Sequence, residues 1–66
     1  MFNSQKLIDY MRENNLTVRK MAELVGVSYP FISYLMNGVH QPSMKTLRKL
    51  SSVMGCSVIE LLLPEV

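Results

Sequence analysis

The sequence predicts an all-α fold of five short helices. No stretch of useful length alternates apolar and polar residues as a strand would, and one punctuation pattern recurs along the chain. In Gly26-Val27-Ser28 and again in Gly55-Cys56-Ser57, a glycine suited to the left-handed conformation is followed by an apolar residue and then by a candidate N-cap. We therefore expect one helix to end and the next to begin at each of these places.

Two further N-caps mark the starts of two more helices. Thr17 and Ser43 are cap residues with apolar neighbours at the spacing of a hydrophobic staple, and Ser57 with Glu60 matches the S-x-x-E capping box. The predicted helices cover residues 3–14, 17–25, 28–36, 43–54 and 57–63.

Apolar residues at helical spacing give the first four helices an inward-facing side. The residues expected in the core are Leu7, Ile8, Met11, Met21, Leu24, Val25, Ile32, Leu35, Leu47, Leu50 and Met54.

Length and composition restrict the class of protein. A chain of 66 residues, 48% of them hydrophobic, is expected to form one folded domain over residues 1–66 rather than a disordered segment. The sequence has no apolar run of about 20 residues and no signal-peptide pattern, so we expect a cytoplasmic protein with no membrane contact. One cysteine and one histidine exclude an internal disulfide and a zinc site. With no paired carboxylates and no phosphate loop, we expect neither an enzyme nor a cofactor.

The connection between the second and third predicted helices is very short. Only Gly26 and Val27 separate them, and a turn of this length cannot lay two helices antiparallel. The helices must cross steeply, as in a helix-turn-helix, and the small side chain of Ala22 permits a close approach. A generic corner between two helices is the alternative interpretation.

Positive charge is concentrated in the middle of the chain. Residues 17–49 contain five Lys and Arg against one Glu, whereas the net charge of the whole chain is +2. This distribution is typical either of a solvated face or of a surface that meets an anionic partner.

An ordered set of residues spans most of the chain: Leu16-Thr17, Met21-Ala22, Leu24, Gly26-Val27-Ser28, Ile32-Ser33, Asn37-Gly38, Pro42-Ser43, Leu47, Leu50, and Gly55-Cys56-Ser57 with Leu61-Leu62. In this order they resemble the phage-repressor/Cro-type helix-turn-helix family, also called the XRE family. The resemblance implies a five-helix, lambda-repressor-like DNA-binding domain with its helix-turn-helix in the second and third helices. It further implies a small transcriptional regulator, here expected to be a repressor, that binds a near-palindromic operator in double-stranded DNA as a two-fold dimer.

The third helix would be the recognition helix. A helical wheel turns Ile32 and Leu35 inward, and the resemblance implies that the outward side approaches the major groove. The expected base-reading residues are Tyr29, Pro30, Ser33 and Tyr34. A tyrosine ring can contact a thymine methyl group, and its hydroxyl can reach a base edge or a phosphate. The alternative is that both tyrosines are ordinary half-buried surface aromatics.

Contacts to the DNA backbone are expected at the helix N-termini, where free amides and a partial positive charge favour phosphate. The candidates are Thr17, Val18, Arg19, Ser28, Asn37, His40, Ser43 and Lys45. Lys45 is notable because a cation in the first turn of a helix is unfavourable for the helix dipole. For Asn37 the alternative role is to cap the end of the third helix.

The sequence departs from the family pattern in three respects. Val18 stands where the family commonly has a phosphate-binding glutamine, and the recognition helix has no Arg, Lys, Gln or Asn before Asn37. Met11 and Met36 occupy places where many members have an arginine–glutamate pair, and they are expected to pack as flexible apolar filler and to leave DNA contact intact. The lack of polar side chains in the recognition helix and the net charge of only +2 favour the alternative function, a protein-interaction module that kept the fold and lost most DNA affinity.

The segment CSVIELLLPEV has more apolar residues than a short helix can bury. Exposed apolar patches on small chains commonly mark partner surfaces, and the resemblance implies a dimer contact here. We expect a weak homodimer through Val58, Ile59, Leu62 and Leu63, with a regulatory protein as a further candidate partner.

Overall fold

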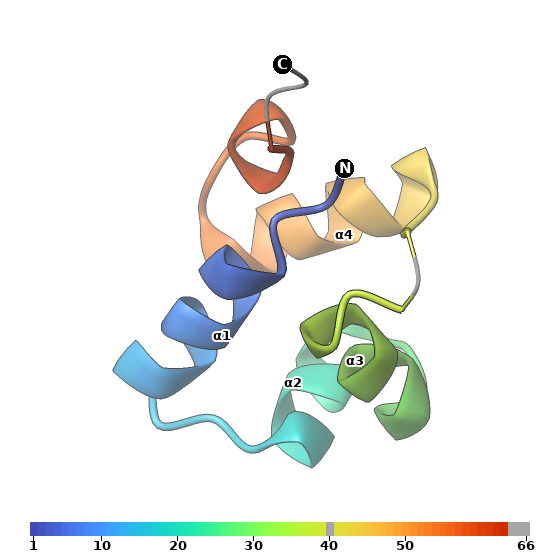
Figure 1. Cartoon of the computed structure of the whole chain (residues 1–66). Coiled ribbons are helices and arrows are strands. Elements are labelled where there is room, and N and C mark those ends of the chain that lie inside the picture. Colours follow the sequence, from blue (N-terminus) through green and yellow to red (C-terminus); the bar gives the residue numbers. More distant parts are fainter. Residues whose placement is uncertain (40, 64–66) are drawn as a thin grey trace.

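A computed structural model describes residues 1–39 and 41–63 of the chain. The elements, in order, are α1 (Ser4–Glu13), α2 (Val18–Val25), α3 (Tyr29–Met36), α4 (Met44–Met54) and a short 3₁₀ helix, η1 (Ile59–Leu61). Figure 1 shows α2 and α3 together at the end of the molecule away from the N-terminus and η1. Within the described ranges, no helix is both long enough and apolar enough to cross a membrane.

Each α-helix begins at a polar side chain whose oxygen accepts a hydrogen bond from the backbone amide three residues later. The capping residues are Asn3, Thr17, Ser28 and Ser43. The prediction of Thr17, Ser28 and Ser43 as N-caps is confirmed.

All four α-helices also end in the same way. A residue with positive φ follows the last turn, and the next amide donates to the carbonyl five residues earlier, as in a Schellman motif. The residues with positive φ are Asn15, Gly26, Gly38 and Gly55. The corresponding hydrogen bonds are Leu16 to Met11, Val27 to Ala22, Val39 to Tyr34 and Cys56 to Ser51. Asn15 was not expected in this role, although asparagine tolerates the left-handed region better than most residues.

The predicted two-residue corner joins α2 to α3. The amides of Gly26 and Val27 both donate to the Ala22 carbonyl, at 2.8 and 3.1 Å. Gly26 has a φ of 81°, a conformation that costs glycine little. Ser28, the cap residue that follows, has an extended backbone, and α3 begins directly after it. The helix α3 packs on α2, and the small Ala22 side chain is buried in the core.

The core contains most of the residues that the helical spacing predicted. The buried residues are Phe2, Leu7, Met11, Met21, Ala22, Val25, Ile32, Leu35, Leu47, Leu50 and Leu61. Ile8 and Met54 are half-buried. The prediction for Leu24 is wrong, since its side chain is 46% exposed. The buried stripe of α2 is centred on Met21, Ala22 and Val25, and Leu24 lies roughly 100° around the helix from that centre.

The predicted fifth helix over residues 57–63 is also wrong. The chain forms only a single 3₁₀ turn at Ile59–Leu61, so the fold has four α-helices in the described residues. The capping box itself is present, because the Ser57 amide donates to Glu60 Oε2 at 2.7 Å and the Glu60 amide donates to Ser57 Oγ at 3.3 Å. Donation from the Ser57 amide, and then from the Ser57 hydroxyl, lowers the pKa of the Glu60 carboxyl below its ordinary value.

A backbone pairing with the N-terminal segment explains why this helix stops. The Asn3 amide donates to the Leu61 carbonyl at 2.8 Å, and the Leu63 amide donates to the Met1 carbonyl at 2.7 Å. Leu62 is accordingly extended, with φ −113° and ψ 137°, and pairs with Phe2. Because the Leu61 carbonyl and the Leu63 amide bond to the N-terminal segment, they do not form the hydrogen bonds that would continue a helix.

Phe2 is the core residue that the sequence patterns missed. Its side chain is only 3% exposed, and its amide donates to Gln41 Oε1 at 2.7 Å. Two residues on, Ser4 Oγ donates to the Leu35 carbonyl at 2.6 Å. The N-terminal segment therefore connects η1 to the end of α3 and to the connection that follows α3.

The Phe2→Ala variant should lose about 3–5 kcal/mol of unfolding free energy, because the change removes a buried aromatic ring and leaves a cavity. Urea unfolding followed by circular dichroism measures this loss. Val39→Ala is the matched control, since Val39 is 68% exposed and its truncation should change stability by less than about 0.5 kcal/mol. Equal losses for the two variants would contradict the core position of Phe2.

Candidate nucleic-acid interface

The outward side of α3 carries two large aromatic side chains. Ile32 and Leu35 are fully buried, whereas Tyr29 is 51% exposed and Tyr34 is 45% exposed. Pro30 is also exposed, and Ser33 is half-buried. The four residues expected to read bases therefore lie on one helix, turned away from the two side chains that anchor it.

Several local features fix the start and the orientation of α3. The Ser28 hydroxyl accepts a hydrogen bond from the Phe31 amide at 3.3 Å. Pro30 lies in the first turn, where its missing amide leaves no internal hydrogen bond unmade and its restricted φ suits a helix. At the other end, the hydrogen bond from Ser4 to the Leu35 carbonyl ties α3 to α1. A short helix is thus held at both ends.

Arg19 of α2 stacks on Tyr29 of α3. The guanidinium carbon lies 5.5 Å from the centroid of the tyrosine ring, within the range of a cation–π interaction. Both residues were expected near DNA, but their contact with each other was not predicted from the sequence. The position of the two residues in the sequence could have indicated the contact, because they occupy the first turns of helices joined by a two-residue corner.

Positive charge lies in the first turns of α2 and α4. Neither first turn contains an acidic residue, while α2 has Arg19 and Lys20 at its second and third positions and α4 has Lys45 at its second position. Cations at these positions oppose the helix dipole, but next to free amides they suit a phosphate group. Lys20 Nζ lies 3.6 Å from Glu23 Oε2, which offsets part of its charge.

The remaining residues expected to contact the DNA backbone differ in how far their side chains are exposed to solvent. Thr17, Ser28 and Ser43 are exposed caps, and their structural role does not prevent a phosphate from approaching the adjacent amides. The Val18 side chain is half-buried and packs against the core, which leaves its backbone at the helix start as the part that can face DNA.

Asn37 is the C-cap of α3, which is the alternative role that the sequence suggested for it. Its amide donates to the Ser33 carbonyl at 3.1 Å, and the residue is exposed. A contact with DNA therefore remains a prediction for Asn37. His40, the other candidate near this end of α3, lies outside the described residues.

A separate apolar surface lies at the other end of the molecule, around η1. Ile59 is 80% exposed, Leu62 37% and Leu63 41%. Met1 is 69% exposed and adjoins them through the Leu63 amide, which donates to its carbonyl. We call these four residues the η1 patch. Val58, which was expected to be part of a dimer contact, is half-buried and packs against the core.

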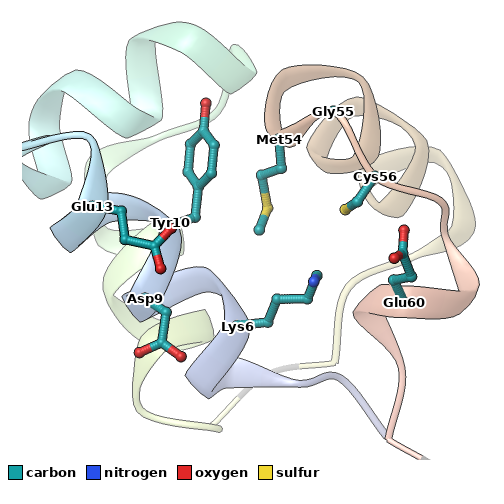
Figure 2. Close-up of a pocket in the computed structure, with 8 residues that line it drawn as sticks. All are labelled: Lys6, Asp9, Tyr10, Glu13, Met54, Gly55, Cys56 and Glu60. Atoms are coloured by element: carbon teal, nitrogen blue, oxygen red, sulfur yellow. The ribbon is translucent and has the colours of Figure 1, made fainter.

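A cavity of about 420 Å³ opens between α1 and the end of α4 with η1 (Figure 2). Its lining residues are Lys6, Asp9, Tyr10, Glu13, Met54, Gly55, Cys56 and Glu60. Figure 2 shows the Lys6 amino group extending across the cavity toward the side that carries Glu60. None of the lining residues belongs to α2 or α3, so the cavity is distinct from the exposed face of α3. Across the described part of the chain, no group of three or more His, Cys, Asp or Glu side chains could hold a metal ion.

Comparisons with known proteins agree with this architecture. A helix-turn-helix family model matches residues 7–61. No match is found among curated protein sequences.

Two solved structures are similar to the chain. One is a SinR protein/SinI protein complex, with a TM-score of 0.80 and 30% identity over 89% of this chain. The other is a transcriptional regulator from Listeria innocua, with a TM-score of 0.81 and 28% identity over 96% of this chain. This chain spans 58% of the first protein and 61% of the second.

The family match covers α2, α3 and the corner between them, which are the elements that hold the tyrosine-bearing face outward. The chain therefore belongs to the XRE-type family of helix-turn-helix DNA-binding proteins.

Proposed function

We propose that this chain is a small transcriptional regulator, acting as a repressor, that binds specific sites in double-stranded DNA. The observation that carries the proposal is the outward face of α3, where Tyr29 and Tyr34 are 51% and 45% exposed and Tyr29 is stacked by Arg19 from the first turn of α2. An α-helix fits the major groove of B-DNA, and side chains on such a face can reach base edges there. Residues 1–66 would act as one DNA-binding domain.

The N-termini of α2, α3 and α4 supply the proposed contacts to phosphate. Their caps, Thr17, Ser28 and Ser43, are exposed, and Arg19 and Lys45 add positive charge within the first turns of α2 and α4. Contacts of this kind set the position of the protein on DNA and make its affinity depend on salt. Tyr29, Pro30, Ser33 and Tyr34 would then contact base edges, while Val18 and Asn37 would contact the DNA backbone beside them.

We further propose that two copies bind a near-palindromic operator, with the two α3 helices about 34–36 Å apart. The η1 patch supports this, because Ile59, Leu62 and Leu63 expose apolar side chains within one short segment, and a second copy would cover them. The patch is small, so the free dimer would be weak and binding to DNA would favour it.

A protein-interaction module is the second candidate function. The chain has a net charge of only +2, and α3 carries no side chain of the type that makes bidentate contacts with a base. One similar structure is a complex of SinR protein with SinI protein, which supports a protein partner for this chain as well. In this alternative the tyrosine-bearing face would bind protein rather than DNA.

Titration of labelled duplex DNA over a range of salt concentrations separates the two candidates. The affinity of a DNA-binding regulator depends steeply on salt. In a plot of log K against the logarithm of the salt concentration, each neutralised phosphate contributes about −0.9 to the slope. Lys45→Ala should weaken binding to specific and random DNA alike and reduce the slope by about one. Arg12→Ala is the matched control, since Arg12 lies on α1, outside the proposed interface, and should leave the slope unchanged. Salt-independent binding, or equal effects of the two variants, would contradict the proposal.

Sedimentation tests the proposed dimer. The wild-type protein should show a mass that rises toward that of two chains with concentration, because association buries the η1 patch. Ile59→Glu should stay monomeric, since it would bury a charge at the contact. Ile59 is 80% exposed, so the variant should keep its fold, which circular dichroism checks. A constant monomeric mass for both proteins would refute the dimer through this patch.

A further inference from the structure

The exposed face of α3 has an unusual chemical composition for a DNA-reading surface. It presents two tyrosine rings, a proline and one half-buried serine hydroxyl. Within Tyr29–Met36, every residue of which is described, there is no Arg, Lys, Asn, Gln, Asp or Glu. Just beyond the helix follow the exposed C-cap Asn37 and Val39, whose side chain is 68% exposed and whose amide donates to the Tyr34 carbonyl.

The four bases differ in what they offer such a face. In the major groove, guanine is read mainly by Arg or Lys, adenine by Asn or Gln, and cytosine by Glu or Asp. Thymine alone presents an apolar group, its C5 methyl, which apolar and aromatic side chains contact. The side chains that would select guanine, adenine or cytosine are missing from α3, and the side chains that suit a methyl group are present.

We infer that this face selects thymine through its 5-methyl group, so that A·T pairs occupy the positions opposite Tyr29 and Tyr34 in each half-site. The inference rests on the proposed function and specifies its DNA substrate. Specificity would come mainly from burial of methyl groups against aromatic rings, with hydrogen bonds from the hydroxyls of Ser33 and the tyrosines as additions.

Arg19 acts as a positioning residue for one of the two rings. Its guanidinium lies 5.5 Å from the centroid of Tyr29 and covers that ring from α2. A ring held in this way loses less conformational freedom when it contacts a base, and its uncovered parts remain available, since Tyr29 is still 51% exposed. Arg19 is also the second residue of α2, so its positive charge belongs to a first helical turn, where a phosphate would meet free amides.

Replacing thymine by uracil tests the inference, because uracil lacks only the 5-methyl group and keeps the same pairing and hydrogen-bonding groups. The probe is a duplex of about 20 base pairs, two helical turns, selected by the wild-type protein from a random pool. Each uracil opposite a tyrosine should lower affinity by about three- to fivefold, the effect of one buried methyl group. Uracil placed outside the half-sites should leave affinity unchanged.

Variants of the tyrosines connect this effect to particular residues. In Tyr34→Ala, the uracil penalty should disappear at one thymine position and persist at the other, which is the signature of a direct contact in a double-mutant cycle. Tyr34→Phe keeps the ring and should keep the penalty. Tyr29→Ala and Tyr29→Phe should give the same pattern at the second position. If an alanine variant fails to fold, the wild-type and phenylalanine measurements still decide the question.

The outcomes separate this inference from the proposed function. Salt-dependent binding without any uracil penalty, or selected half-sites that require G·C pairs opposite the tyrosines, overturns the inference and leaves DNA binding in place. A uracil penalty that both alanine variants retain also overturns it. If the protein shows salt-dependent binding to no duplex at all, the proposed function and the inference are both overturned.

Discussion

The carbonyl oxygen of Ala22 accepts hydrogen bonds from both residues of the corner between α2 and α3, and the rest of the candidate site depends on this arrangement. The bonds from Gly26 and Val27, at 2.8 and 3.1 Å, end α2 and turn the chain at once into the cap of α3. Because only two residues are available, α3 has little freedom in how it leaves α2. Its inward residues, Ile32 and Leu35, are then fully buried, and its tyrosines must face outward.

This constraint also explains how charge and aromatic surface come together. The corner places the first turn of α3 where Arg19, in the first turn of α2, can stack on Tyr29. A basic side chain that would be unfavourable at a helix start thereby gains a partner, and the aromatic ring gains a fixed position. The first turns of α2 and α3 thus bring an exposed aromatic ring, a positive charge and two helix N-termini together, which is the combination that the proposed DNA contact requires.

The sequence predicted the features that depend on neighbouring residues and missed those that depend on distant ones. The caps at Thr17, Ser28 and Ser43 and the corner at Gly26 follow from side chains within a few positions, so local patterns were sufficient. The fifth helix was predicted from a capping box that the structure does contain. Pairing of residues 61–63 with the N-terminal segment, however, ends the helical backbone after one turn. Burial of Phe2 depends on that same pairing. The Arg19–Tyr29 stack requires the relative placement of two helices, which helical periodicity within either one does not contain.

The central claim is that the face of α3 bearing Tyr29 and Tyr34 is the surface that meets DNA. The most direct test is to record backbone amide NMR spectra of the protein as duplex DNA selected from a random pool is added. The largest shifts should fall on the amides of residues 28–37, among which Pro30 has none, and on the first turns of α2 and α4. Shifts confined to the η1 patch or to the residues lining the cavity beside α1, with α3 unchanged, would contradict it.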